Sequence, residues 1–129
     1  MTTAVQVEIT DELAISTLRS VVAERPGYIY SAPDHMEVGS TDTSCFYVHT
    51  DEGGSPVSAG CVIGVVLNRL GLPLERLAME EGITASSVVM RNFPRLSAKT
   101  REQFNDMQMR QDEGEPWGLA YAKATGDTI

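Results

Sequence analysis

The spacing of apolar residues near the start of the chain predicts a helix. Ile15, Leu18 and Val22 recur at intervals that place their side chains on one helix face. Thr10 precedes them as a candidate N-cap, and the Arg-Pro-Gly sequence at 25–27 ends the pattern. We therefore expect a first helix between these two signals.

Two short segments rich in aromatic and β-branched residues predict strands. They comprise residues 28–30 and 45–50, and a polar connection separates them. We expect them to pair in a small antiparallel sheet. The next segment, 51–58, contains Gly, Ser and Pro in a pattern typical of a loop.

Residues 61–70 form the most continuously apolar segment, and we interpret them as a buried central helix. The segment is long for a strand, and Gly71 suits the left-handed position that follows a helix. A strand is the alternative, because the segment is rich in valine and Gly60 and Gly64 are unfavourable in a helix.

The C-terminal half predicts four further helices, at 73–81, at 84–92, at 97–112, and from Pro116 onward. In the last of them one face carries Trp117, Ala120, Tyr121 and Ala124.

The helix expected at 97–112 has few apolar positions, chiefly Phe104 and Met107. A helix with so sparse an apolar stripe turns most of its surface to water or to a partner. It could also pair two copies of the chain, since Met107 and Met109 are adaptable contact residues.

Together these elements predict an α+β fold, a mainly helical single domain with a small antiparallel sheet packed on a buried central helix. A length of 129 residues suits one domain, which we place at 1–124, followed by a disordered tail at 125–129. The longest apolar run is too short to cross a bilayer, and the start lacks the pattern of a secretory signal. We expect a cytoplasmic protein whose two cysteines are thiols.

The net charge of −8 argues against a nucleic-acid partner, because such binding needs Lys and Arg to neutralise phosphates. All the excess acid lies in residues 1–90, whereas residues 91–129 carry six basic and six acidic side chains. Four cations stand together with no acid between them. A solvated helix face is the favoured interpretation, and a docking patch for an acidic partner is the alternative. These cations are Arg91, Arg95, Lys99 and Arg101.

The cysteines and histidines offer the only candidate for catalytic chemistry. Cys61 would begin the central helix, where free N–H groups favour a thiolate, and His49 lies on the strand leading to it. The favoured alternative is that Cys61 is a small buried hydrophobe. Cys45 and His49 on one strand would lie roughly 13 Å apart, too far to share an ion, so we expect no metal. Common nucleotide and calcium motifs are missing, so we expect no cofactor.

The segment 108–118 breaks a local rule, because its acids fall in the last turn of a helix, where the helix dipole disfavours them. If it is functional, it presents a polar and aromatic binding surface. The favoured alternative is a structural corner in which Gly114 turns the chain and Trp117 anchors the last helix. The residues of that surface would be Gln108, Gln111, Asp112 and Trp117.

The stretches CVIGVVLNRLGLP and MQMRQDEGEPWGLAYAKA together resemble a pattern found in small uncharacterised proteins of actinobacteria and their bacteriophages. The resemblance covers roughly residues 59–124. It implies a bacteriophage-type accessory protein that acts inside an actinobacterial cell. That family has no established activity, so the resemblance implies no catalytic residue.

We expect from these observations a non-catalytic accessory protein that binds another protein, a factor of the bacterial host. Neither nucleic acid nor a membrane is an expected partner, and a homodimer is one option. The alternatives are a thiol-dependent hydrolase or transferase that uses Cys61 and His49, and a protein that binds or sequesters a small ligand. The candidate binding residues are Arg95, Lys99, Gln108, Gln111, Asp112 and Trp117.

Overall fold

The computed structural model describes residues 9–32 and 46–129, which contain six helices and two strands. The helices are α1 (Asp11–Glu24), α3 (Val62–Arg69), α4 (Leu74–Ala78), α5 (Ala85–Asn92), α6 (Ala98–Asp112) and α7 (Trp117–Thr125), and the strands are β1 (Val48–Thr50) and β2 (Pro56–Ala59).

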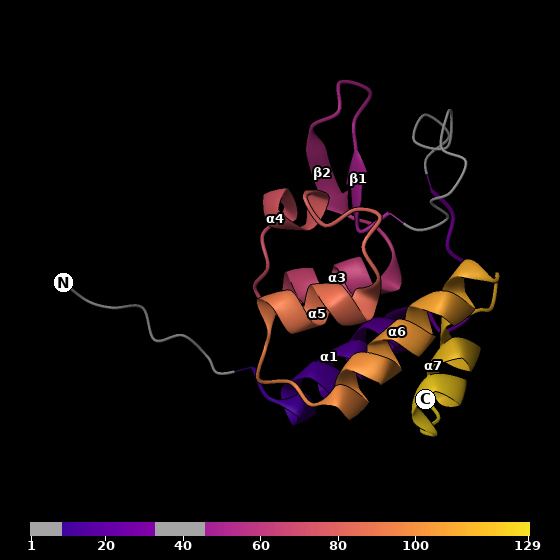
Figure 1. Ribbon diagram of the computed structural model, residues 1–129. Coiled ribbons are helices and arrows are strands. Elements are labelled where there is room, and N and C mark those ends of the chain that lie inside the picture. Colours follow the sequence, from indigo (N-terminus) through magenta and orange to yellow (C-terminus); the bar gives the residue numbers. More distant parts are fainter. Residues whose placement is uncertain (1–8, 33–45) are drawn as a thin grey trace.

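Helices α1 and α6 run side by side, with α3 and α5 crossing above them and α7 beside α6 (Figure 1). The β1–β2 hairpin stands at the other end of the molecule, with α4 next to it. The predicted α+β class, mainly helical with a small antiparallel sheet, is therefore confirmed.

The first helix begins and ends where its sequence signals place it. The hydroxyl of Thr10 accepts a hydrogen bond from the N–H of Leu13 at 3.1 Å, and the helix ends at Glu24. Its inward face buries Leu18 and Val22 in the core.

The central helix is also confirmed, and two glycines, Gly60 just before it and Gly64 inside it, have a packing role. A Cβ atom on Gly64 would lie 2.2 Å from the carbonyl oxygen of Tyr47, and one on Gly60 would lie 2.3 Å from that of Phe46. Since side chains are never this close to a backbone oxygen, only glycine lets α3 lie directly against the chain at 46–47. The glycines therefore reflect a close approach and not a strand.

The predicted pairing of the sheet is wrong. Residues 28–30 form no strand, and β1 pairs instead with β2, which lies in the segment predicted to be a loop. The hairpin forms because the Asp51 carboxylate accepts hydrogen bonds from the N–H groups of Gly53 and Ser55, both at 2.9 Å. That local turn leaves enough residues for a second strand.

Helix α6 differs from the expectation drawn from its sparse apolar stripe. It packs between α5 and α7 and against α3, and its exposed residues are few (Figure 1). Polar side chains such as Thr100 and Gln111 are buried within it. The helix is covered because these polar groups form hydrogen bonds inside the protein. Its exposed residues are Ala98, Lys99, Glu102, Met109 and Asp112.

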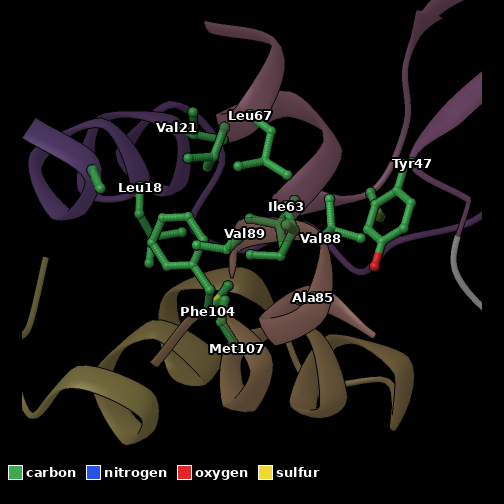
Figure 2. Packing of buried hydrophobic residues seen from close by; sticks show 14 of the residues in the cluster. Leu18, Val21, Tyr47, Ile63, Leu67, Ala85, Val88, Val89, Phe104 and Met107 are labelled. Carbon is green, nitrogen blue, oxygen red and sulfur yellow. The ribbon is translucent and has the colours of Figure 1, made fainter. Parts of the chain in front are cut away.

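The core lies where four helices meet the start of the hairpin (Figure 2). Leu18 of α1, Ile63 of α3, Val88 of α5 and Phe104 of α6 are all fully buried there. Met107 is also fully buried, so it is not available to contact a second copy of the chain. Met109 remains exposed.

The segment predicted to be a disordered tail has defined contacts in the structure. Thr125 is the last residue of α7, and Gly126 follows it in the left-handed conformation with φ of 79°. The Asp127 carboxylate then accepts hydrogen bonds from Arg19 of α1 and Tyr121 of α7.

A single side chain, that of Gln111, joins three elements inside the protein. Its Oε1 atom accepts hydrogen bonds from the N–H of Val62, the first residue of α3, at 2.8 Å and from the indole N–H of Trp117 at 3.1 Å. Gln111 is only 2% exposed, so water cannot replace either bond. The amide therefore holds the start of α3 and the start of α7 to α6.

Gln111→Ala should lower the free energy of unfolding by about 2–4 kcal/mol, because two buried N–H groups lose their acceptor. Urea unfolding followed by Trp117 fluorescence measures this change. Gln103→Ala, on the same helix but partly exposed, serves as the control and should change stability by less than about 0.5 kcal/mol. Equal urea midpoints for the two variants would contradict the role assigned to Gln111.

Candidate functional site

The residues of the 108–118 corner contribute mainly to the interior. Trp117 is 1% exposed, and its ring packs edge-to-face on Tyr28 with centroids 4.9 Å apart. Gln111 is buried as described above, and Gln108 lies 3.2 Å from the hydroxyl of Tyr47. Asp112 is exposed and accepts a hydrogen bond from Gln111. The buried members hold the fold together and offer no surface to a partner.

The other two candidate residues, Arg95 and Lys99, lie at the opposite end of α6. Lys99 and Asp112 are thirteen positions apart on the helix, which places them about 20 Å apart along the axis. The structure therefore does not bring the six candidates together in one site. Arg95 and Lys99 are both exposed.

The thiol of Cys61 is enclosed in the core. The residue is 0% exposed, and its N–H donates a hydrogen bond to the carbonyl of Phe46 at 2.9 Å. The His49 Nε2 atom lies 2.8 Å from the hydroxyl of Tyr30, and the imidazole covers Gly60. A substrate has no access to the sulfur in this arrangement.

A metal site finds no support in the described residues. Within residues 9–32 and 46–129, no three His, Cys, Asp or Glu side chains converge as ligands. Cys45, which the sequence placed too far from His49 to share an ion, lies outside the described residues, as does His35.

Because Cys61 is buried, its alkylation by iodoacetamide in the native protein should be at least about a hundredfold slower than in urea, and limited by unfolding. Peptide mass spectrometry separates Cys61 from Cys45 and so measures each rate by itself. Rapid modification of native Cys61 would instead indicate an accessible thiol and would revive the thiol-dependent enzyme hypothesis.

Glu81 is a partly buried carboxylate that serves the hairpin. Its two oxygens accept hydrogen bonds from the N–H groups of Tyr47 at 2.8 Å and Val48 at 3.2 Å. Burial raises the pKa of the Glu81 carboxyl, while the two N–H groups act in the opposite direction. Both of its oxygens are engaged by the backbone, so we assign Glu81 a structural role.

Because the pKa of Glu81 is raised in the folded protein, its contribution to the free energy of unfolding decreases as pH rises. The folded protein holds the Glu81 proton more tightly than the unfolded chain, so stability falls as pH rises from about 4.5 through the raised pKa. Glu81→Gln cannot ionise. The free energy of unfolding of the natural protein minus that of the variant should therefore decrease from pH 4 to pH 8, as measured by urea unfolding. A difference that grows with pH would contradict the raised pKa.

Four cations surround the connection between α5 and α6, and we call them the basic corner. Arg101 donates a hydrogen bond to the carbonyl of Leu96, which holds its guanidinium beside the connection. Arg91 lies 3.3 Å from the buried carboxylate of Glu80, which it shares with Arg76 of α4. The basic corner comprises Arg91, Arg95, Lys99 and Arg101.

A shallow groove lies on each side of the first turn of α6. The α5–α6 groove has a volume of about 280 Å³ and contains Met90, which is 53% exposed. The α1–α6 groove has a volume of about 500 Å³ and includes Lys99. The α5–α6 groove is lined by Ser86, Ser87, Met90, Ala98, Arg101 and Glu102.

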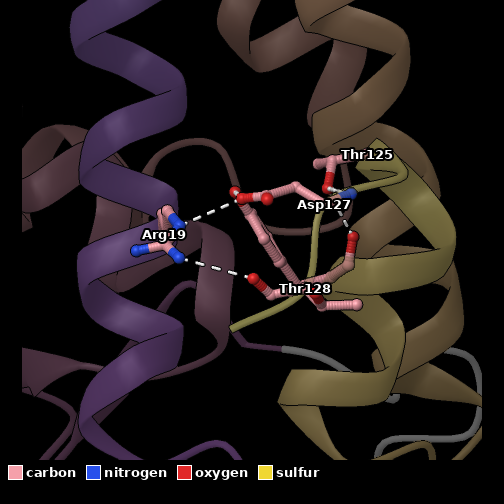
Figure 3. A network of polar contacts seen from close by, with 5 residues as sticks. Arg19, Thr125, Asp127 and Thr128 are labelled. Carbon is pink, nitrogen blue, oxygen red and sulfur yellow. Dashed lines mark hydrogen bonds and ion pairs between the residues drawn. The ribbon is translucent and has the colours of Figure 1, made fainter.

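Tyr121 and Asp127 also line the α1–α6 groove, and Figure 3 shows the contacts of Arg19 with Asp127 and Thr128. Arg19 Nε lies 3.0 Å from Asp127 Oδ2, and the Tyr121 hydroxyl donates to the same oxygen at 2.7 Å. The hydrogen bond from Tyr121 and the guanidinium of Arg19 lower the pKa of the Asp127 carboxyl. Three residues that the sequence did not suggest as candidates therefore meet in one place.

Neither Met90 nor this cluster gave a signal in the sequence. Met90 fits the apolar pattern of its helix, and nothing in that pattern says that it is exposed. Asp127 lies 108 residues from Arg19, and only the folded chain brings them together.

Comparison with known proteins finds no relative from which a function could be inferred. No family model matches the chain, and no curated protein or solved structure matches it with significant similarity. Among residues 9–32 and 46–129, every helix is too short or too polar to cross a bilayer.

Proposed function

We propose that this protein acts without catalysis, by binding an acidic protein through the basic corner. The observation that carries the proposal is the segregation of charge. Residues 91–101 contain four cations and no acid in a chain whose net charge is −8. Positive charge gathered on one part of an otherwise acidic surface favours a partner of complementary charge and speeds its approach. Two acids also lie there, Asp11 at the α5–α6 connection and Glu102 in the α5–α6 groove.

The contacts of the four cations support a surface role. Arg91, Arg76 and the buried Glu80 together retain one positive charge when their two ion pairs are counted. Arg95 and Lys99 are exposed. The hydrogen bond from Arg101 to the backbone reduces the entropy that its guanidinium loses on binding.

The α5–α6 groove supplies an apolar contact next to these charges. Met90 is unbranched and polarisable, and such side chains adapt to different partner surfaces. The volume of about 280 Å³ is below the usual range of small-molecule pockets. The groove is shallow and contains the exposed Met90, so it suits one apolar side chain of a protein.

The resemblance to proteins of actinobacteria and their bacteriophages supports a setting for this function. In this proposal the protein is a bacteriophage-type accessory protein in the cytoplasm of an actinobacterial host, and the partner is a host protein. The burial of Cys61 supports binding over a thiol-dependent reaction.

A photo-crosslinking experiment tests the proposal. p-Benzoylphenylalanine at position 90 should crosslink to an acidic protein in an actinobacterial lysate, and the pair Arg95→Gln and Lys99→Gln should reduce that product at least about tenfold. The charge-matched control is the pair Ser55→Glu and Ser58→Glu on the distant hairpin, which changes net charge equally and should have little effect.

Position 57 provides a second control. Val57 is 57% exposed on the hairpin, so a crosslinker there reports adhesion that is not specific to the basic corner. The proposal fails if positions 57 and 90 capture the same proteins, or if removal of the two charges leaves the product unchanged.

A further inference from the structure

Two arginines from different helices meet on one buried carboxylate. The side chain of Glu80, which follows α4, is only 2% exposed. Arg76 Nη2 lies 3.4 Å from Glu80 Oε1, and Arg91 Nη1 lies 3.3 Å from Glu80 Oε2. Because one carboxylate bridges both guanidiniums, their spacing also suits a second carboxylate that approaches from solvent. The two arginine side chains are 40% and 53% exposed, so a ligand in solution can reach them.

The hydrogen bonds of the two arginines leave donors for such a ligand. Arg76 Nε donates to Asn92 Oδ1 at 3.1 Å, which fixes the orientation of that guanidinium. Asn92 is itself fixed, because its Nδ2 donates to the carbonyl of Val88 at 2.9 Å. Within residues 9–32 and 46–129, Glu80 Oε2 accepts no hydrogen bond, so Arg91 meets it only as an ion pair. A guanidinium has five N–H groups, and those that remain can bind an oxyanion.

The charge at this place favours an anion. Arg76 and Arg91 carry two positive charges and Glu80 carries one negative charge, which leaves one positive charge. Of the neighbouring acids, Glu81 is engaged by the backbone of the hairpin, and the exposed Glu75 forms an ion pair with neither arginine in the described part of the chain. A surplus of one charge matches one carboxylate better than a phosphate monoester, which carries a charge of about −1.5 to −2 at pH 7.

A second group of cations and acids, between α6 and α7, has no such surplus. Arg110 and Lys123 both pair with Glu115, at 3.6 and 3.1 Å. Arg110 also donates to Asp106 at 2.8 Å. Two acids therefore balance the two cations, and this group provides a matched control for the first.

We propose that Arg76 and Arg91 form a carboxylate clamp, in which the two guanidiniums together bind one Asp or Glu side chain of the acidic partner. The proposal deepens the proposed function and rests on it for the identity of the partner. Since Arg91 also belongs to the basic corner, the clamp extends the binding surface from that corner to α4. The buried Glu80 holds the two guanidiniums together from the interior of the protein.

An acidic peptide tests the clamp in the full-length protein. The probe is the N-acetylated, C-amidated tetrapeptide Glu-Glu-Glu-Glu, and NMR follows its binding through the Nε–Hε signals of the arginines. The signals of Arg76 and Arg91 should move, and the affinity should fall as salt is added. Arg76→Lys and Arg91→Lys keep the charge but remove the planar pair of donors. Each should weaken binding about tenfold, the loss expected for one hydrogen bond to a charged group.

Three controls assign the effect to the clamp. Arg110→Lys makes the same change in the balanced group and should leave the affinity unchanged. The corresponding tetrapeptide of glutamine should not bind. Millimolar inorganic phosphate at constant ionic strength should not displace the acidic peptide, because its charge exceeds the surplus at the clamp. Urea unfolding verifies that each variant is folded, as expected because lysine retains the ion pair with Glu80.

The outcomes separate the clamp from the proposed function. Equal peptide affinity for the natural protein and both lysine variants overturns the clamp, because the arginines then supply charge alone. Displacement by phosphate, or signal changes confined to other arginines, overturns it as well. If the clamp binds the peptide while position 90 captures no acidic protein, the clamp stands and the proposed function fails. If position 90 captures an acidic protein equally in the natural protein and in Arg76→Lys, the clamp alone is wrong.

Discussion

The structure depends on supplying acceptors to the buried start of α3. A helix leaves its first N–H groups without partners in the helix, and at a buried position water cannot provide them. Here the N–H groups of Gly60 and Cys61 donate to the backbone at 46–47, and that of Val62 donates to Gln111. The 46–48 backbone is itself held by the Glu81 carboxylate. The hairpin, α3 and α6 are thus joined by one connected set of hydrogen bonds.

These hydrogen bonds join two stretches that lie far apart in the sequence, residues 61–73 and 107–124. The first contains the start of α3, and the second contains Gln111 and Trp117, which meet it inside the protein. Both are largely devoted to packing. Gln111 and Trp117, which the sequence suggested as binding residues, are therefore used by the fold, whereas Lys99 and Met90 lie exposed at the proposed binding surface.

The sequence predicted those features that local chemistry decides. Thr10 and Ser97 cap their helices through their own hydroxyls, and Gly71 and Gly114 adopt positive φ beyond helix ends, so all four signals could be read from neighbouring residues. The strand pairing could not be read, because it depends on the Asp51 turn bringing two short segments together. The four cations of the basic corner could be read from the sequence, but the grooves beside them could not, because each depends on how two helices pack side by side, and α1 and α6 are far apart in the sequence.

The close contact between α3 and the backbone at 46–47 also restricts how the hairpin can move. At Gly60 and Gly64 the backbone lies directly against the backbone of residues 46–47. A change of side-chain rotamer therefore cannot loosen the contact between α3 and the base of the hairpin. The base of the hairpin moves with α3 as a rigid body. Any displacement of its tip, at 51–55, therefore comes from bending of the two strands above that base, where the pairing is irregular between His49 and Thr50.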